Sequence, residues 1–364
     1  MRIAIDGREL QGRPTGVGRF LTGVMAAWDV LPDARQHEFL VLTPPPPRGS
    51  TAWEQLTLPR LIRAARADVL FAPGYTGPLR CPVPMVVAIY DVSFAARPDW
   101  FGWREGTRRR VLTRLTAHRA ARVVTTSEFS RAEIARLLRV AASKIEVVYP
   151  GVHAAAPAAS PGHPRANARG TAEGGPASDR PGDPAEPMVL YVGSLFTRRH
   201  IPALVAGFAQ IARRRRELRL EIVGDNRTRP HVDVDALVRA SGVSDRIAVR
   251  SYVSDETLAG LYARARVFVF LSEYEGFGLT PLEALAAGLP IVVLDTPVAR
   301  EVYGDAALYV PRAEPDLVAA AMDRVLDDDT ERARILAAAG PTLRRYSWEA
   351  CARQVLAALT TAAP

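Results

Sequence analysis

The sequence predicts an α/β fold with two doubly wound domains, each a parallel sheet covered by helices, that face each other across a cleft. Short apolar runs alternate with segments of helical periodicity in both halves of the chain, a pattern typical of parallel sheets. The length of 364 residues suits two domains of ordinary size. Between the halves, residues 154–187 are rich in Ala, Pro and Gly and almost free of large apolar side chains, which predicts a disordered linker or surface insertion.

Each expected strand is a short run rich in Val, Ile and Leu, as buried parallel strands require. Each expected helix has apolar residues three and four positions apart. In the first half the strands cover residues 2–5, 38–42, 68–71, 85–89, 122–125 and 145–148, and the helices lie near 17–28, 104–118 and 128–139. In the second half the strands lie near 188–192, 218–223, 246–249, 267–271, 290–293 and 307–310, and the helices near 200–214, 231–240, 256–264, 281–287 and 314–328.

These elements predict an N-terminal Rossmann-like domain over residues 1–153 and a C-terminal one over residues 188–345. The last segment, residues 346–364, is expected to form an amphipathic helix with Ser347 as its N-cap. The sequence alone is compatible with this helix packing on either domain. A ligand site is expected in the cleft between the two domains.

Composition limits the class of protein. About half of the residues are apolar, which excludes global disorder. Cys81 and Cys351 lie far apart and are expected to be buried thiols in a reduced cytosol. The start of the chain, Met1 to Asp6, lacks the apolar core of a signal peptide, and no apolar run approaches the roughly 18 residues of a membrane span. We therefore expect a soluble cytoplasmic protein.

Positive charge is concentrated in the first half. Residues 1–150 carry 22 Arg and Lys against 13 Asp and Glu, a net charge of +9 within a total of +8. One segment crowds several arginines beside three aromatic residues: Arg104, Arg108, Arg109, Arg110, Arg114, Arg119 and Arg122, with Trp100, Phe101 and Trp103. This segment is either a face that rests on anionic lipid or binds a phosphorylated lipid acceptor, or a solvated basic helix. No nucleic-acid motif accompanies the charge.

The most informative stretch is EGFGLTPLE, residues 275–283, which follows the apolar run 266–271. A strand, a glycine loop and a helix in this order form a ligand site at the carboxyl end of a parallel sheet. Gly276 and Gly278 allow backbone amides to approach a ligand. We expect Pro281 at the first helical position and Glu283 in the first turn. A carboxylate can accept two hydrogen bonds from a vicinal diol, although Glu283 could also simply complement the helix dipole.

With its flanks, the stretch SEYEGFGLTPLEALAAGLPIVV (272–293) resembles the signature of the family 4 glycosyltransferases, retaining nucleotide-sugar enzymes with the GT-B fold. The resemblance implies a donor side in the C-terminal domain and an acceptor side in the N-terminal domain. It also implies that the first glutamate and the following amides hold the donor sugar, and that the second glutamate holds the ribose. The donor-binding residues implied here are Glu275, Gly276, Phe277, Gly278, Leu279 and Glu283. The resemblance further implies that the C-terminal helix crosses back to the N-terminal domain.

Two further segments are candidates for binding the donor phosphates. Thr15 is a possible cap for a helix whose first amides, at Gly16, Val17 and Gly18, suit a phosphate. The spacing of these glycines does not fit a dinucleotide-binding motif. The segment IDGRELQGRPTGVGRF (5–20) resembles the family's opening loop, which closes over the donor phosphates.

In the second segment, Gly193 ends the first strand of the second domain and precedes Arg198 and Arg199. The resemblance implies that these arginines stabilise the diphosphate leaving group, where fixed cations would lower the barrier. Alternatively, Arg198 and Arg199 belong to a solvated basic turn without a role in binding. His200 stands where relatives usually have Asn. Base selectivity is expected around Tyr252 and Val253.

The main departure from the family pattern is at Tyr90-Asp91, where relatives usually have His-Asp near the reacting sugar. A tyrosine can donate a hydrogen bond but cannot act as a base near neutral pH. The histidine is therefore dispensable, or the acceptor chemistry is altered, or the protein is inactive. The segment Ser127 to Ser130 also matches a family loop at the cleft, and it either touches phosphate or is a plain helix cap.

Metal signals are weak. Asp233 and Asp235 are expected to be first-turn acids of a helix rather than metal ligands. The histidines show no ligand spacing; they are His37, His118, His153, His163, His200 and His231.

The resemblance therefore implies a retaining glycosyltransferase that moves a hexose of the mannosyl, glucosyl or rhamnosyl class from a nucleoside diphosphate sugar to an acceptor hydroxyl, without cofactor or metal. The expected setting is the assembly of bacterial surface polysaccharide or glycolipid. The implied catalytic residues are Glu275, Arg198, Arg199, Asp91 and Tyr90. The expected partners are the donor and a glycan or lipid-linked acceptor, with peripheral contact to an anionic membrane left open and no nucleic acid. The alternatives are an inactive sugar-nucleotide sensor or scaffold, and an epimerase or phosphorylase on the same fold.

Overall fold

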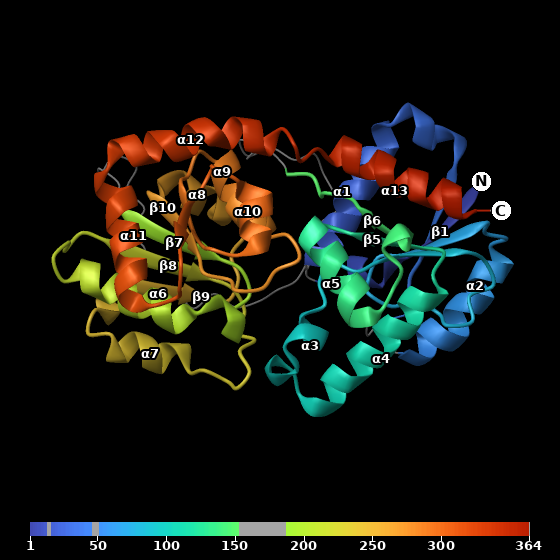
Figure 1. Ribbon diagram of the computed structural model, residues 1–364, viewed down its shortest axis with the longest axis horizontal. Helices are drawn as coiled ribbons and strands as arrows, with labels where there is room; N and C mark the ends of the chain where they lie inside the picture. The colour runs from blue at the N-terminus through green and yellow to red at the C-terminus, as the bar shows by residue number, and fades with distance from the viewer. Residues whose placement is uncertain (13–15, 46–50, 153–186, 364) are drawn as a thin grey trace, which may run out of the picture.

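The structure is a computed structural model that describes residues 1–12, 16–45, 51–152 and 187–363. It consists of two lobes, each built on a six-stranded parallel sheet (Figure 1). Residues 154–186, most of the segment predicted to be a disordered linker, lie outside the described residues.

The N-terminal sheet has the strand order β2-β1-β3-β4-β5-β6, with every pair parallel. All six strands were predicted within a residue or two, since buried parallel strands carry apolar side chains on both faces. Their bounds are β1 (Arg2–Asp6), β2 (Glu38–Leu42), β3 (Val69–Ala72), β4 (Met85–Ala88), β5 (Arg122–Thr125) and β6 (Ile145–Val147).

The helices of this lobe include the three predicted ones and two that were not predicted. The predicted ones are α1 (Gly16–Val30), α4 (Trp103–Arg119) and α5 (Glu128–Leu138); the others are α2 (Leu58–Ala64) and α3 (Ser93–Ala96). Pro59 hides α2 in the sequence, because a proline normally ends a helical pattern. Here the chain enters α2 through a π-helical turn, Trp53–Thr57, so Pro59 falls at the start of the α-helix.

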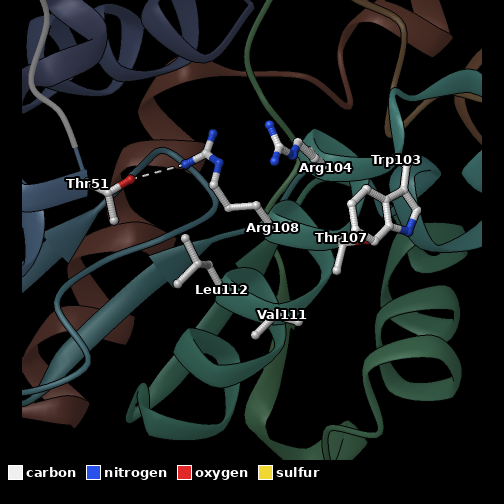
Figure 2. Close-up of a pocket in the computed structure, with 7 residues that line it drawn as sticks. All are labelled: Thr51, Trp103, Arg104, Thr107, Arg108, Val111 and Leu112. Carbon is white, nitrogen blue, oxygen red and sulfur yellow. Dashed lines mark hydrogen bonds between the residues drawn. The ribbon is translucent and has the colours of Figure 1, made fainter.

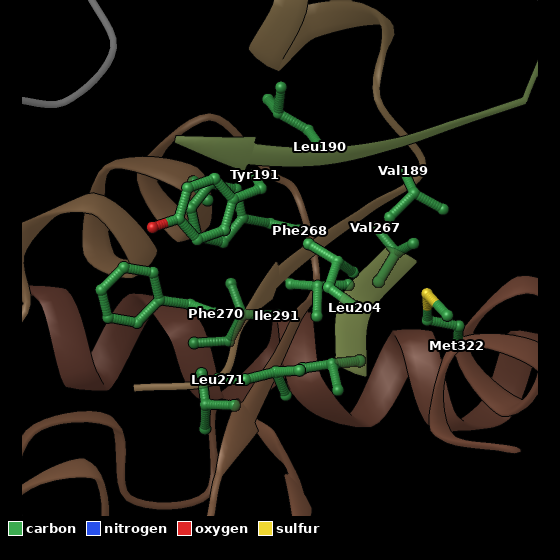
Figure 3. Packing of buried hydrophobic residues seen from close by; sticks show 14 of the residues in the cluster. Val189, Leu190, Tyr191, Leu204, Val267, Phe268, Phe270, Leu271, Ile291 and Met322 are labelled. Carbon is green, nitrogen blue, oxygen red and sulfur yellow. The ribbon is translucent and has the colours of Figure 1, made fainter. Parts of the chain in front are cut away.

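The C-terminal sheet has the order β12-β11-β10-β7-β8-β9, again all parallel. Its strands are β7 (Met188–Val192), β8 (Arg219–Val223), β9 (Ile247–Arg250), β10 (Val267–Phe270), β11 (Ile291–Leu294) and β12 (Leu308–Val310), as predicted. Figure 3 shows Val189, Val267 and Ile291 of this sheet on the same side as Leu204 and Met322, which come from helices beside the sheet.

The five predicted helices of this lobe are present as α6 (Ile201–Ala212), α7 (Val234–Ala240), α8 (Asp255–Arg264), α9 (Leu279–Ala286) and α11 (Pro315–Asp327). Two more, α10 (Pro297–Tyr303) and α12 (Asp329–Leu343), were not predicted. The first is short, and the second contains Pro341, which weakens its helical signal. Within the described ranges, no helix is both long enough and apolar enough to span a membrane.

The C-terminal helix α13 (Trp348–Ala362) lies on the N-terminal lobe against α1 and strands β3 to β5 (Figure 1). Ser347 caps it by accepting a hydrogen bond from the Ala350 amide. The Trp28 indole donates to the Ala352 carbonyl oxygen over 2.9 Å. The Trp348 ring fills the space that a side chain at Gly23 or Gly151 would occupy. This crossing is the arrangement that the family resemblance implies.

Candidate active site in the interdomain cleft

Two adjoining cavities lie between the lobes. The first, about 430 Å³, is lined by Gly16, Arg19, Phe20 and Tyr90 of the N-terminal lobe, and by residues of the C-terminal lobe that include Gly193, Arg199, Glu275, Phe277, Gly278 and Leu279. The second, about 1000 Å³, shares Gly16, Phe196 and Arg227 with the first and extends to Asp91, Trp100 and Arg198. In the C-terminal sheet the strand order reverses between β7 and β10, and Gly193 and Glu275 follow these strands. Ligands of open α/β sheets bind at such a switch point.

Glu275 is the best-anchored acid of the first cavity. Its Oε1 accepts hydrogen bonds from Arg199 Nε at 2.9 Å and Ser272 Oγ at 2.8 Å. Only 14% of its side chain is exposed. Burial works against the charged form, but the Arg199 and Arg198 guanidinium groups and the Ser272 hydroxyl outweigh it, so the pKa of Glu275 is below its ordinary value. Glu275 is therefore an ionised, rigidly held acceptor.

The helix after the Glu275 loop starts earlier than expected. Helix α9 begins at Leu279, with Gly278 as its N-cap at φ +90°. Pro281 is therefore the third helical residue, not the first, and Glu283 lies in the second turn, not the first. The left-handed Gly278 starts the helix two residues earlier than proline placement suggested. As a result the amides after Gly276 lie at the positive end of α9, a position suited to a ligand oxygen.

Glu283 reaches across to the other lobe. Its Oε1 accepts from Arg19 Nη1 over 3.0 Å, and its Oε2 lies 3.4 Å from the Tyr262 hydroxyl. Arg19, Leu279 and Thr280 line the first cavity beside it. A ribose that bound Glu283 would therefore exchange with Arg19. The sequence pattern gave no signal for this pair, because its members are 264 positions apart.

Arg198 and Arg199 both lie close to Glu275 Oε1, at 3.8 Å and 2.8 Å. Arg199 is nearly buried, pairs with Glu275, donates to the Ser194 carbonyl oxygen and stacks on Phe270. Arg198 donates Nε to the Tyr274 carbonyl oxygen and stacks on Phe196, 4.2 Å from the ring centre. Arg198 lines the larger cavity and Arg199 the smaller one. The contact of these arginines with a diphosphate stays a prediction. In the structure, Arg199 holds the Glu275 carboxylate.

The glycine loops approach both cavities. Helix α1 begins at Gly16, so Val17 and Gly18 are in its first turn; Thr15, the expected cap, lies outside the described residues. Gly16 lines both cavities and Val17 lines the larger one. Gly193 has φ +141°, and a Cβ there would lie 2.6 Å from Arg199 Nη1. Tyr252 and Val253, where base selectivity is expected, also line the smaller cavity, together with Ser251 and Asp255.

Tyr90 and Asp91 point in different directions. The Tyr90 ring packs edge-on against Phe20 and Tyr75, and its buried hydroxyl has no hydrogen-bond partner in the part of the chain that the structure describes. Burial raises the pKa of Tyr90 well above its ordinary value, so it cannot act as a base. The Asp91 carboxylate accepts from the Ser93 amide at 2.8 Å and the Tyr75 hydroxyl at 2.9 Å, and it lines the larger cavity.

Several contacts of the site were absent from the sequence-based prediction. They include Ser272, which donates to Glu275, Tyr303, whose hydroxyl donates to the Gly278 carbonyl oxygen, and Arg19.

Asp233 is the N-cap of α7, accepting from the Ala236 amide, and Asp235 follows in the first turn. Among the described residues, no group of three or more His, Cys, Asp or Glu side chains is arranged to hold a metal ion.

Most of the basic segment lies on α4. Trp103 is 79% exposed, Val111 50% and Leu115 45%, so an apolar strip lies open to solvent. Figure 2 shows Arg104 and Arg108 projecting from the same helix around a surface cavity of about 620 Å³, with Arg108 donating to Thr51. Such a helix combines exposed apolar and cationic side chains.

Two family models match the chain: one described as Glycosyltransferase Family 4 over residues 21–156, and one described as Glycosyl transferases group 1 over residues 179–340. The O-antigen chain mannosyltransferase B of Escherichia coli is 31% identical over 234 residues, which is 64% of this chain and 59% of the relative. The alpha-D-kanosaminyltransferase of Streptomyces kanamyceticus is 29% identical over 46% of this chain and 44% of the relative. The match thus spans less than two thirds of either relative.

Among solved structures, Anabaena HepE in complex with UDP-glucose aligns with a TM-score of 0.73 over 99% of this chain and 100% of that chain, at 15% identity. At this identity the likeness concerns the fold, which is GT-B.

Proposed function

Because the chain belongs to the family 4 glycosyltransferases, we propose that it is a retaining enzyme that transfers a hexose from a nucleoside diphosphate sugar to an acceptor hydroxyl. The observation that carries this proposal is the donor loop, defined as residues 275–278. It combines the ionised Glu275 with the amides at the start of α9, beside Arg198 and Arg199 in one cleft. The relative from Escherichia coli, named an O-antigen chain mannosyltransferase, supports a mannosyl donor, with glucosyl and rhamnosyl donors as alternatives, and a role in bacterial surface polysaccharide or glycolipid assembly.

In the proposed reaction, Glu275 and the amides of Phe277 and Gly278 hold the sugar. Glu283 releases Arg19 and binds the ribose instead. The bond between the anomeric carbon and the phosphate oxygen breaks, and Arg198 and Arg199 stabilise the charge on the departing diphosphate. The acceptor oxygen bonds to the same face of the anomeric carbon, and its proton passes to the leaving phosphate oxygen. The nucleoside diphosphate then leaves with no covalent enzyme intermediate. These two arginines supply the positive charge, so we propose that turnover needs no metal.

The larger cavity is the proposed acceptor site. Its wall carries Tyr75, Phe94, Trp100 and Phe101, and the Asp91 carboxylate. Aromatic faces pack against the apolar faces of sugar rings, and carboxylates accept hydrogen bonds from hydroxyls. These side chains support a glycan or lipid-linked saccharide as acceptor.

One observation favours a second function, an inactive sugar-nucleotide sensor. Tyr90 stands where relatives usually have histidine, and its hydroxyl is buried without a partner among the described residues. Turnover separates the two functions, because a sensor would bind the donor without releasing nucleoside diphosphate. The same product excludes an epimerase, and inertness toward orthophosphate argues against a phosphorylase.

The first prediction concerns donor binding. In the presence of EDTA, one nucleobase class among GDP, UDP, dTDP and ADP, with the corresponding sugars, should raise the melting temperature by several degrees. A ligand at 100 times its Kd adds about 2.7 kcal/mol to the stability of the folded state, enough for such a shift in a domain of this size. Differential scanning fluorimetry measures it. A flat response to the whole panel would contradict the donor site, and a response that appears only with Mg²⁺ would contradict metal independence.

We further propose that the α4 face, defined as Trp103, Arg104, Arg108, Val111 and Leu115, rests on an anionic membrane at its inner surface. Its exposed apolar strip and arginines support this contact. The same contact would bring a lipid-linked acceptor to the cleft, because the larger cavity includes Gly102, Glu105 and Arg109 at the start of α4.

The second prediction tests that contact. Vesicles of phosphatidylcholine with phosphatidylglycerol should retain the wild-type protein at low salt and release it as salt screens the charges. Trp103→Asp should weaken partitioning roughly tenfold or more, since burying one large apolar side chain contributes about 1.5–3 kcal/mol. Val30→Asp is the matched control, because Val30 is also strongly exposed, at 69%, but lies at the end of α1. Co-sedimentation measures both; absence of binding by the wild type would leave α4 as a solvated basic helix.

A further inference from the structure

The turn between β5 and α5 of the N-terminal lobe holds one carbonyl group of the donor loop. Ser127 Oγ donates to the Gly276 carbonyl oxygen over 2.6 Å, and Thr126 Oγ1 donates over 3.2 Å. Ser130 Oγ lies 3.3 Å from the same oxygen and donates to the Tyr90 carbonyl oxygen at 2.8 Å. All three hydroxyl side chains are buried. Three hydroxyls from one lobe thus surround a single backbone oxygen of the other.

The fit around Gly276 is tight. A Cβ on Gly276 would overlap the Tyr90 carbonyl group, so the backbones of the two lobes are in direct contact here. The C-terminal lobe also holds the turn from a second direction. The Glu301 carboxylate, on α10, accepts from the Glu128 amide at 2.7 Å and the Phe129 amide at 2.9 Å. The turn is therefore anchored to the C-terminal lobe by two separate groups of hydrogen bonds.

The orientation of this carbonyl group matters for the proposed donor site. The Gly276 carbonyl and the Phe277 N–H belong to one planar trans peptide unit, so they point in opposite directions. Hydroxyls that hold the oxygen therefore also set the direction of the Phe277 N–H. In the proposed function, which this inference rests on, that N–H donates to the donor sugar. An N–H group that already points at the bound sugar helps to hold the anomeric carbon in the geometry that reacts.

We propose that Ser127 and Thr126 are positioning residues for donor transfer: they clamp the Gly276–Phe277 peptide of the opposite lobe and thereby aim the Phe277 N–H at the sugar. The donor site is then completed by the N-terminal lobe, through groups that do not touch the donor. Ser127 also caps α5, since its Oγ accepts from the Ser130 amide at 3.0 Å. A useful test must separate the hydrogen bond that Ser127 makes to Gly276 from its role as the N-cap of α5.

Ser127→Gly separates the two roles, because glycine is a tolerated N-cap that costs only a few tenths of a kcal/mol relative to serine. Ser127→Thr keeps the hydroxyl, and Thr126→Val removes the second one without a change of shape. Ser347→Gly is the matched control, since Ser347 caps α13 in the same way. The measurements are kcat and KM for the sugar donor, Kd for the nucleoside diphosphate alone, and melting temperature.

We expect Ser127→Gly to lower kcat roughly 10- to 100-fold, because a buried carbonyl loses its main donor. Thr126→Val should also lower kcat, whereas Ser127→Thr, which keeps the hydroxyl, should have a kcat close to that of the wild type. The Kd for the nucleoside diphosphate, which lacks the sugar, should not change, and the melting temperature should fall no further than in Ser347→Gly. A Ser127→Gly variant with wild-type kcat and only the stability loss of Ser347→Gly would overturn the clamp.

A readout without turnover keeps this inference separate from the proposed function. In Ser127→Gly the Phe277 amide should exchange its hydrogen roughly 10- to 100-fold faster, because the peptide is released locally. Amides in the middle of α5 should be unaffected. If the wild type shows no transferase activity, the proposed function fails, and the exchange rate alone then decides the clamp. An unchanged exchange rate at Phe277 would refute it.

Discussion

Glu275→Gln should lower kcat roughly 10- to 100-fold and leave the Kd for the nucleoside diphosphate unchanged. The physical reason is the loss of a charge-assisted hydrogen bond to the sugar, worth about 1.5–3 kcal/mol when it strengthens in the transition state. Glutamine has the same shape as glutamate, so Ser272 and Arg199 can still contact its side-chain oxygen. Steady-state kinetics with saturating donor, together with calorimetry of nucleotide binding, measure the two quantities.

The amide is a better choice than alanine because of the Glu275–Arg199 pair. Removing the whole carboxylate would leave a nearly buried guanidinium without its partner, and breaking such a pair costs about 3–5 kcal/mol. A loss of activity in Glu275→Ala would then mix chemistry with unfolding. Melting curves of both variants show whether the amide avoids this loss.

Glu283→Gln is the matched comparison within the same motif. Glu283 is proposed to bind ribose, so its change should weaken binding of donor and free nucleoside diphosphate alike, with kcat at saturation little altered. Arg19 would lose its ion-pair partner, but both side chains are partly exposed and the stability cost should be small. Unchanged kinetics in both glutamine variants would contradict the assignment of the motif.

Gly276→Ala should abolish most of the activity, with kcat/KM reduced at least about 100-fold. A Cβ at this position meets the backbone of Tyr90, which cannot rotate away as a flexible side chain would. The two lobes would have to separate locally, at a cost of about 1–3 kcal/mol or more, and the hydroxyls of Thr126 and Ser127 would lose the carbonyl that they hold. Donor turnover and melting temperature measure the result.

Gly260→Ala controls for the general effect of replacing glycine. Gly260 lies within α8, and a Cβ there meets no described atom within 4 Å. Alanine is the better helix former by about 1 kcal/mol, so this variant should keep full activity with equal or higher stability. Wild-type activity in Gly276→Ala would mean that the contact between the lobes is not needed for turnover.

The sequence predicted the strands of the sheets better than the short helices. Strands such as Val267–Phe270 are buried on both faces, so their apolar runs are visible without any tertiary information. Helix α10 was missed because it has only seven residues, and α2 because Pro59 masks its start. In the site, Glu275 and the glycines were found from local spacing. The Arg19–Glu283 pair and the hydroxyls around Gly276 join positions more than 140 apart, and no periodicity reports such contacts.

Helix α13 has a consequence for the order in which the chain is made and folded. Its buried residues, among them Ala352, Val355 and Leu359, belong to the same apolar core as Ile3, Phe20 and Trp28. The C-terminal lobe is complete once its own contiguous stretch has been synthesised, whereas the lobe begun first at the ribosome still lacks part of its core. We therefore expect the N-terminal lobe to complete its core only when α13 docks, which ties residues that precede and follow the C-terminal lobe into one cooperative unit.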